Sequence, residues 1–382
     1  MRILRLLALL AIAGCAIDDP PLDPEMPSAP ARSLDGLDSV SRARFLAGLK
    51  EFSEHETAPE GLGPLFNGGS CADCHSLGGP GGGGIATVVR AGCMSPEGFT
   101  APPGGTLIFA FSIRPDIAAA AIPAGCDVMT RRRTTSLFGA GLIEAIPDDA
   151  ITAAAAEQAS GEGPHGTVAW VTDVASGTRR VGRFGWKAQH ATLDSFAGDA
   201  YRNEMGITNE LFPTENAPNG DAAALAEMDW VPDPEARVGV VGELADFMRF
   251  LAAPQARSGD HAAGKALFSA TGCAVCHRPS FTTAADAGTG RAEVTVALYS
   301  DLLLHDIDTG DGIPQGAAGA SQLRTPPLWG VGAASTLLHD GRTSSLDAAI
   351  VAHGGEARTA QQRYLALAPD QRTSLLDFLR SL

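Results

Sequence analysis

Two short cysteine motifs constrain the fold of this chain more than any other feature. Residues 71–75 read CADCH and residues 273–277 read CAVCH. Each motif holds two thiols and an imidazole within five residues, a combination that can bind zinc, form a redox disulfide or attach a haem. The chain must therefore present the same chemical group from two segments that lie far apart in the sequence.

The spacing of the motifs favours haem attachment. A four-thiolate zinc site has its cysteine pairs roughly 15–20 residues apart, whereas these pairs lie about 200 residues apart. A thioredoxin-like motif needs a βαβ setting, and helix–loop patterns surround both motifs. Haem attachment needs two thiols for the vinyl groups and a following histidine for the iron. The sequence therefore predicts two covalently bound haem c groups, attached through Cys71, Cys74, Cys273 and Cys276 and ligated on the proximal side by His75 and His277.

The N-terminus has the features of an export signal. Arg2 and Arg5 precede a short apolar run, which is too short to span a bilayer. The ending at residues 12–15, IAGC, resembles a bacterial lipobox, in which Cys15 would carry lipid; the alternative is an ordinary signal with an incidental cysteine. We expect a signal peptide at 1–15, a Pro-rich, acidic tether at 16–35, and an exported lipoprotein in the periplasm or anchored to the outer membrane of a bacterium.

Export also bears on the remaining cysteines. Of the seven cysteines, Cys93 and Cys126 belong to neither motif nor signal. In an exported chain this even pair predicts a disulfide, with free buried thiols as the alternative.

The composition excludes some partners. The net charge of −16 argues against nucleic acid, because phosphate binding needs clustered Lys and Arg. The one basic run, 131–133, is too short to reverse this and is typical of a solvated face or of partners for carboxylates. An acidic surface instead suits a basic protein partner. Few aromatic residues (6%) beside 45 Gly and 25 Pro suit a loop-rich fold whose core includes something other than aromatic side chains, for which a flat cofactor would qualify.

Apolar periodicity predicts a mainly α fold. Phe45, Leu49 and Phe52 share one helical face, and a second helix runs from Val238 to Leu251 and stops at Pro254. Further helices are expected over residues 260–272 and from Pro369 to the C-terminus. Alternation over 167–186, with Ser-Gly at the turn, predicts a small β-hairpin. We expect domains at 36–253 and 254–382, the hairpin being an insertion in the first.

The two halves also repeat beyond the cysteine motifs. RTTSLFGAG at 133–141 matches RTPPLWGVG at 324–332, and a GR…LD segment at 182–200 matches 341–353 after a six-residue insertion in the first copy. A duplicated unit with one haem explains both matches. In this alignment His353 occupies the position of Ala200. We therefore expect His353 to close the second haem and the first to lack an equivalent ligand, although Tyr201 or Met205 could still supply one. A surface or capping role is the alternative for His353.

At this level the chain resembles the di-haem oxidoreductase family, within the bacterial di-haem cytochrome c peroxidase superfamily. The resemblance lies in GLGPLFNGGSCADCH, GLIEAIPDDAI, GRFGWKA, EMGITN, GCAVCHRPSF, LYSDLLLHDID, RTPPLWGVG and LLHDGRTSSLDAAIVAHGGEA. It implies two cytochrome c-like domains. Electrons from a small redox protein, a cytochrome c or a cupredoxin-like protein, would enter at the C-terminal haem and reduce hydrogen peroxide at the N-terminal haem. A di-haem electron-transfer cytochrome and an oxidase of another substrate are the alternatives.

The resemblance also implies site residues. A distal acid that moves a proton on peroxide would be Asp194, where the superfamily has Glu, or Glu144; a salt bridge to Arg133 or Arg183 is the alternative role for both. A Thr-x-Pro segment that helps to hold calcium between the domains would be Thr325 and Pro327, although no Asn partner follows the first motif. Trp186 or Trp329 could bridge the haems, or simply pack in the core.

Overall fold

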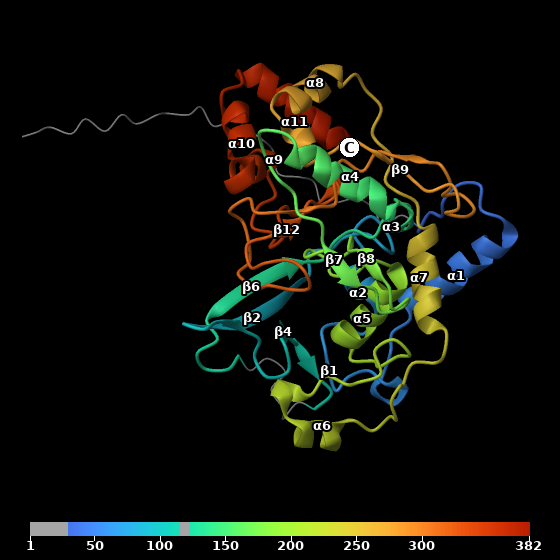
Figure 1. Ribbon diagram of the computed structural model, residues 1–382. Coiled ribbons are helices and arrows are strands. Elements are labelled where there is room, and N and C mark those ends of the chain that lie inside the picture. Colours follow the sequence, from blue (N-terminus) through green and yellow to red (C-terminus); the bar gives the residue numbers. More distant parts are fainter. Residues whose placement is uncertain (1–29, 115–121) are drawn as a thin grey trace, which may run out of the picture.

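The computed structural model describes residues 30–114 and 122–382 (Figure 1). The expected signal peptide, Cys15 and the first part of the tether lie outside the described residues. The end of the tether differs from expectation. Ser33 forms a β-bridge with Leu251, and the buried Leu34 donates its backbone N–H to Phe250 at 2.8 Å. This segment is fixed on the protein because Leu34 joins the apolar core. Within the described ranges, no helix has the length and apolarity needed to cross a bilayer.

The fold is rich in helices and loops, with several small sheets. The α-helices are α1 (Ser39–Ser53), α2 (Cys71–Cys74), α3 (Ala140–Glu144), α4 (Asp148–Ala159), α5 (Leu193–Met205), α6 (Ala222–Met228), α7 (Val240–Phe250), α8 (Ala262–Ala270), α9 (Leu346–Val351), α10 (Arg358–Leu365) and α11 (Pro369–Ser381). Short 3₁₀ helices are η1 (Ala58–Glu60), η2 (Pro218–Gly220), η3 (Cys273–Val275), η4 (Val331–Ala333) and η5 (Gly355–Ala357). The strands are β1 (Leu65–Phe66), β2 (Thr87–Ser95), β3 (Gly98–Thr100), β4 (Leu107–Ile108), β5 (Phe111–Ser112), β6 (Val128–Arg133), β7 (Trp170–Thr172), β8 (Arg179–Val181), β9 (Phe281–Thr282), β10 (Thr295–Val296), β11 (Leu304–His305) and β12 (Leu323–Arg324).

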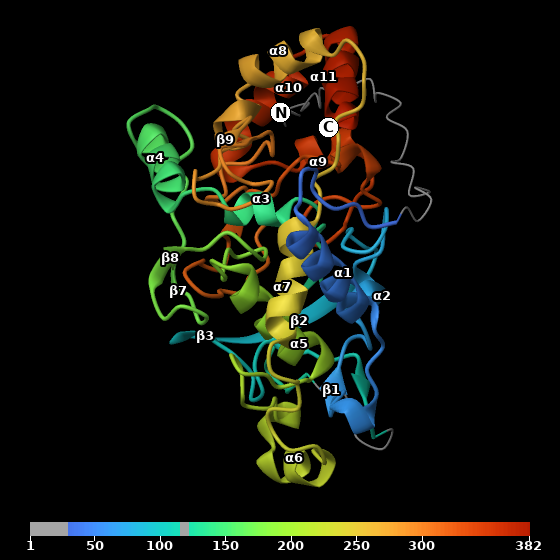
Figure 2. The same ribbon diagram turned by 90° about the vertical axis from the view of Figure 1, so that its right-hand side faces the viewer.

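The same helix pair occurs twice. In the first half α1 packs against α7, and in the second half α8 packs against α11 (Figures 1 and 2). Glycine allows both close approaches: a Cβ on Gly48 would lie 2.1 Å from the carbonyl oxygen of Glu243, and one on Gly264 would lie 2.1 Å from that of Ser374. Any larger residue would push the two helices apart. Four residues after each glycine, Phe52 and Phe268 enter the core.

The segments that match in sequence also match in structure. The first copy of the RT…L motif leads into α3, which packs on α7; the second leads into η4, which packs on α11. The two LD segments both begin a helix behind a capping hydroxyl: Thr192 Oγ1 accepts from Ser195 N, and Ser345 Oγ accepts from Ala348 N. The predicted internal repeat is therefore confirmed at the level of the elements.

Two apolar clusters form the main core, and each contains the first cysteine of one motif. Cys71 packs against a cluster built on α1, α5 and α7, and Cys273 packs against one built on α8, α9 and α11. Each half also contributes residues to the surroundings of the other. Phe281, Val296 and Leu302 of the second half pack in the first cluster. In the other direction, α4 reaches the second motif: Gln158 Nε2 donates to the carbonyl of Val275 at 3.0 Å. The chain therefore crosses back over the expected boundary near residue 253.

The first half contains more β-structure than the sequence predicts. The predicted hairpin is present as β7 and β8, paired from Trp170–Val181 to Thr172–Arg179. A sheet of β3, β2 and β4, with β6 on β2, was not predicted. The run 131–133 lies in β6, and Arg132 is not solvated; it is buried and paired with Asp311 at 2.7 Å. The predicted disulfide between Cys93 and Cys126 is confirmed and ties this sheet to the segment before β6.

Candidate functional site

Local sequence shapes each cysteine motif into a single helical turn. In the first, Ser70 and Asp73 form a capping box: Asp73 N donates to Ser70 Oγ, and Ser70 N donates to Asp73 Oδ2, both at 3.1 Å. In the second, a left-handed Gly272 begins η3, and its turn ends at Cys276. Both turns leave their two thiols half-buried and the histidine just beyond the turn. This brings the two sulfurs and the imidazole of each motif to one place.

All three predicted iron ligands are anchored through Nδ1 to a main-chain carbonyl. His75 Nδ1 donates to Gly82 O at 3.2 Å, His277 Nδ1 to Tyr299 O at 3.0 Å, and His353 Nδ1 to Ala349 O at 2.7 Å. Such a bond fixes the ring and leaves Nε2 as the nitrogen for a metal. The carbonyl of Thr135 also contacts the ring of His75.

Burial keeps these imidazoles neutral, as iron binding requires. It lowers the pKa of His75 to about 4. For His277, burial and then the nearby charge of His353 lower the pKa to about 4. The electrostatic effect indicates that His353 and His277 lie close together, on different elements of the second half. A phenylalanine flanks each proximal ring, with centroids 6.2 Å apart for Phe52 and His75 and 6.4 Å apart for Phe268 and His277.

The helices that carry His353 and Ala200 differ in length. Helix α9 ends at Val351, so His353 stands just beyond its last turn. Helix α5 continues to Met205, so Ala200 lies within the helix. The core-facing residue of α5 at this level is Tyr201, which is 5% exposed, and the charge of Cys71 affects its pKa. The buried residue of α5 next to Ala200 is therefore Tyr201.

The Tyr201 hydroxyl already has a partner. It donates to Glu56 Oε1 at 2.7 Å. Burial and this bond to Glu56 raise the pKa of Tyr201 well above its usual range, so the phenol stays protonated. Burial also raises the pKa of Glu56, against the opposing effect of the Tyr201 hydrogen bond. The pair is a neutral donor bonded to a carboxylate beside the first motif.

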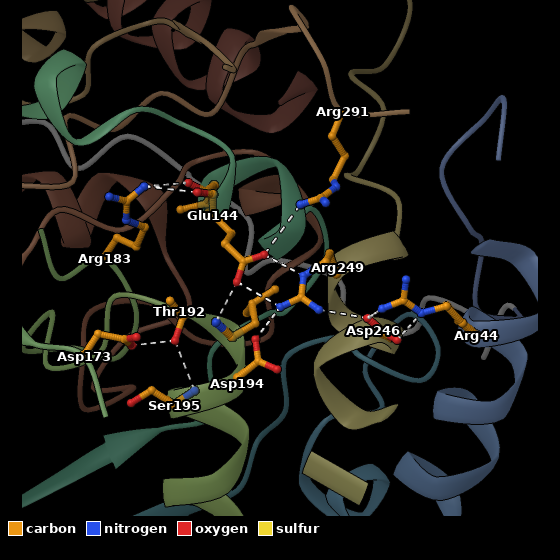
Figure 3. A network of polar contacts seen from close by, with 12 residues as sticks. Arg44, Glu144, Asp173, Arg183, Thr192, Asp194, Ser195, Asp246, Arg249 and Arg291 are labelled. Carbon is orange, nitrogen blue, oxygen red and sulfur yellow. Dashed lines mark hydrogen bonds and ion pairs between the residues drawn. The ribbon is translucent and has the colours of Figure 1, made fainter. Parts of the chain in front are cut away.

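Both candidate acids bind one arginine (Figure 3). Arg249, on α7, lies 2.7 Å from Glu144 through Nε and 2.6 Å from Asp194 through Nη2. Glu144 also accepts from the backbone N–H of Leu193 at 2.9 Å, and Arg291 lies 3.5 Å away. The network extends through Asp246 to Arg44. A salt-bridge role was one of the two roles weighed for these acids.

Arg183 and Arg133, which were the expected salt-bridge partners of these acids, bind other groups instead. Arg183 donates to the main-chain carbonyl of Glu144 at 3.2 Å and forms an ion pair with Asp148. Arg133 donates to the carbonyl of Leu338 at 2.9 Å. Burial raises the pKa of Glu144, but the bonds and charge of Arg249 outweigh burial, and the net pKa lies below its usual range. Glu144 is therefore an ionised, paired carboxylate at neutral pH.

A cavity of about 880 Å³ lies where the two copies of the repeat meet. Arg133 and Trp186 from the first half and Arg324 and Trp329 from the second all line it, and Gly83, shortly after the first motif, also lines it. Its volume is in the range of cofactor sites. Neither Glu144 nor Asp194 lines it. Both tryptophans proposed to bridge the haems thus lie at one cavity.

Two cavity arginines lack a carboxylate partner in the part of the chain that the structure describes. Burial lowers the pKa of Arg133 to about 10, and burial, against the charge of Asp301, lowers that of Arg324 to about 10. Buried cations need an anion. A haem carries two propionates, so the fixed imidazoles, the paired thiols and these arginines fit the predicted haems.

The residues at 325–327 fit calcium poorly. The carbonyl of Thr325 accepts from Ser300 Oγ at 2.6 Å and from Arg324 Nη1 at 3.2 Å. A calcium ion needs such oxygens free, and a guanidinium at this distance repels it. The calcium site at Thr325 and Pro327 stays a prediction that the local contacts do not favour.

A further buried histidine, His305, lies beside the second motif. His305 Nε2 donates to Asp301 Oδ2 and its Nδ1 to Glu356 Oε2, both at 2.9 Å, and Cys276 Sγ lies 3.8 Å away. Burial lowers the pKa of His305, but its bonds to Asp301, Cys276 and Glu356 raise it to about 12. The side chain is a buried imidazole held between two acids beside the second motif, and these acids favour its protonated form. No sequence pattern pairs these three residues.

Comparisons with known proteins extend these findings. Residues 124–382 match the family described as "Di-haem oxidoreductase, putative peroxidase". Among solved structures, the chain is similar to the diheme peroxidase BthA from Burkholderia thailandensis, with 17% identity, 94% of each chain covered and a TM-score of 0.43. It is similar to a MauG-like protein associated with microbial copper homeostasis, with 16% identity, 94% of each chain covered and a TM-score of 0.40. It is also similar to Kuenenia stuttgartiensis hydrazine synthase, with 15% identity, 100% of this chain and 99% of that chain covered and a TM-score of 0.42. No curated protein matches the chain.

Proposed function

Because this chain belongs to the di-haem oxidoreductase family, we propose that it is an exported peroxidase with two covalent haem c groups. It would pass electrons from a small redox protein, through the haem of the second half, to hydrogen peroxide at the haem of the first half. The observation that carries this proposal is the repeated arrangement of two half-buried thiols and a neutral, Nδ1-anchored imidazole, one in each apolar core. We assign each half to one cytochrome c-like domain.

The residues that would hold the haems follow from this arrangement. Cys71 and Cys74 would form the thioethers of haem 1, and Cys273 and Cys276 those of haem 2. His75 and His277 would be the proximal ligands, with His353 as the distal ligand of haem 2, supported by its closeness to His277. Arg133 and Arg324 are positioned at the cavity to bind propionates. When bound, the haems supply iron centres that accept and pass on single electrons.

The distal side of haem 1 is proposed to stay open for peroxide. Ala200 offers only a methyl group, and the Tyr201 phenol is protonated and bonded to Glu56. A proton for peroxide could come from the Tyr201–Glu56 pair or from Asp194, the more exposed of the two candidate acids at 34% of its side chain. Glu144 is held by two arginines, which argues for a structural role.

A spin-state measurement tests this function. We expect the oxidised protein to show two c-type haems, one of them low-spin, and the half-reduced protein to show a high-spin haem 1 that reacts with hydrogen peroxide. A reduced cytochrome c or cupredoxin should then be oxidised by added peroxide. If both haems of the half-reduced protein are low-spin and peroxide has no effect, the peroxidase assignment fails.

A di-haem electron-transfer cytochrome is the second candidate, and one observation favours it. Tyr201 lies on the core-facing side of α5, close enough to Cys71 for electrostatic coupling. If Tyr201 left Glu56 and ligated haem 1, both irons would be six-coordinate and the protein would only transfer electrons. The same spectra separate the two functions.

A further inference from the structure

Three carboxylates converge between the loop after α5 and the loop before α7. Glu215 lies in the loop after α5, and Asp233 and Glu235 lie in the loop before α7. One oxygen from each of the three acids lies within 4.8 Å of the other two. In Figures 1 and 2, α6, which lies between these two loops in the sequence, is at the opposite end of the molecule from α8 and α11. The three acids belong to the first half of the chain, whereas residues 325–327 belong to the second.

In the described structure, the polar partners of these acids include no basic side chain. Among residues 30–114 and 122–382, no arginine, lysine or histidine forms an ion pair with Glu215, Asp233 or Glu235. Their polar partners are main-chain N–H groups and one hydroxyl: Glu215 Oε1 accepts from Asn216 N at 2.8 Å, and Glu235 Oε2 accepts from Thr208 N at 2.6 Å. Buried carboxylates are rarely left unpaired, because removing their charge from water is costly.

Glu215 points independently to a missing ligand. The residue is only 9% exposed, and its Oε2 is buried without a hydrogen-bond partner in the described structure. An unpartnered carboxylate oxygen with two other carboxylates beside it needs either a proton or a cation.

The contacts of Thr208 lead to the same conclusion. Its Oγ1 accepts from Glu235 N at 3.2 Å, lies 2.5 Å from Asp233 Oδ1, and also contacts Glu235 Oε2. A hydroxyl has one proton and can donate it to only one of the two carboxylates. The other oxygen–oxygen contact is repulsive unless that carboxyl group is protonated or a cation lies among these atoms.

We propose that Glu215, Asp233 and Glu235 bind one calcium ion, with Thr208 beside them. Calcium binds oxygen ligands at roughly 2.3–2.6 Å, so oxygens on opposite sides of one ion lie about 5 Å apart, which the three carboxylates match. All three ligands are carboxylates, which suit a hard cation, and they come from irregular loops, which suit calcium better than the strict octahedron of magnesium.

Calcium would tie the loop after α5 to the loop before α7. These helices pack on each other in the first core, and α5 carries Tyr201. A cation bound by both loops would hold the C-terminal end of α5 in place. The site is thus a structural clamp for the first half, and its occupancy does not depend on which reaction the haems perform.

The test uses the full-length, haem-loaded protein after dialysis against a chelator. We expect titration calorimetry with calcium chloride to show binding, and thermal unfolding followed by far-UV circular dichroism to show a higher Tm with calcium. Glu215→Gln and Glu235→Gln should each weaken calcium binding more than about tenfold, because each removes a charged ligand. Glu227→Gln, on the exposed side of α6, is the matched control and should bind as the wild type does.

The variants also give a readout that is independent of binding. In chelator at neutral pH, Glu215→Gln should have a higher Tm than the wild type, because the wild type must protonate or bury the Glu215 carboxylate on folding and the amide need not, and calcium should not raise its Tm further. Haem absorption spectra report that each variant is folded and loaded. The proposal is overturned if the wild type binds no calcium, or if Glu215→Gln and Glu235→Gln bind calcium as tightly as Glu227→Gln does.

Discussion

Arg249 donates two hydrogen bonds to the carboxylate of Glu144, at 2.7 and 3.2 Å, and the two side chains are only 15% and 14% exposed. Because this ion pair is shielded from water, its geometry is fixed and protonation of Glu144 would leave the buried charge of Arg249 unbalanced. A catalytic acid has to exchange protons during turnover, whereas this carboxylate is held ionised (Figure 3).

We therefore predict that Glu144→Gln mainly reduces stability. The substitution leaves part of the Arg249 charge unbalanced in a buried site, so the free energy of unfolding should fall by about 3 kcal/mol. Asp194→Asn should cost less than about 1 kcal/mol, because Asp194 is more exposed and Arg249 keeps Glu144 and Asp246. Denaturant unfolding measures both. A Glu144→Gln protein of normal stability that has lost peroxide turnover would instead make Glu144 catalytic.

His353→Ala should change haem 2 alone. Removing the proposed distal ligand should convert haem 2 from low-spin to high-spin and leave the spectrum of haem 1 as it was. Electron paramagnetic resonance of the oxidised protein separates the two haems. His165→Ala, at an exposed position with no proposed role, is the control. An unaltered haem 2 spectrum in His353→Ala would remove this assignment.

Tyr201→Phe should leave the spin state of haem 1 unchanged. The ring still fills the core, and only the bond to Glu56 is lost, at a cost of about 1 kcal/mol in the free energy of unfolding. The measurement is the same resonance spectrum, compared with that of the wild type. A shift of haem 1 from low-spin to high-spin would show that Tyr201 ligates the iron and would support the electron-transfer alternative.

Without calcium, stability should fall as the pH rises from about 4.5 to about 8. The pKa of Glu215 is raised from 4.5 to about 8 by burial and nearby acids, so between these values the folded protein binds more protons than the unfolded chain. Protonation therefore stabilises the fold, and the loss across this range should be on the order of a few kcal/mol. Unfolding in chelator at several pH values measures it. Glu215→Gln should flatten this dependence; equal slopes in the two proteins would contradict the assignment.

Cys15→Ser should release the protein from membranes. Lipid on Cys15 is the only membrane anchor that we propose, and within the described parts of the chain no helix could replace it. Fractionation of expressing cells, with haem absorbance as the marker, measures the change. Continued membrane association of Cys15→Ser would remove the lipoprotein assignment.

The sequence predicted what local patterns encode. The two cysteine turns, the helices α1, α7, α8 and α11 and the motifs of the repeat depend on residues close together in the chain, such as Phe45 and Phe52 in α1, and the sequence predicted them. The hairpin at β7 and β8 was found because its turn lies between alternating strands. The sheet around β2 was not, because its strands are short and come from separate segments.

Long-range partners also escaped prediction. Arg249 lies 105 residues from Glu144 in the chain, and nothing in the sequence distinguishes it from the arginines that were named instead. In the sequence, Glu215 precedes α6 and Glu235 follows it. The two side chains come together only because the loops on either side of α6 fold back toward each other. Charge pairing of this kind is set by tertiary packing and leaves no periodic signal.

The exchange of segments between the halves has a mechanical consequence. Residues near 281–302 complete the first core, and α4 contacts the second motif; Ala284 N also donates to Ala145 O at 2.9 Å. Two domains that touch only through surface charges can separate when salt screens those charges. The two halves of this chain cannot separate in that way, because each contributes residues that pack inside or against the other. The distance from His75 to His277 is thus fixed by interlocked chain, and changes in ionic strength should affect only what binds from outside.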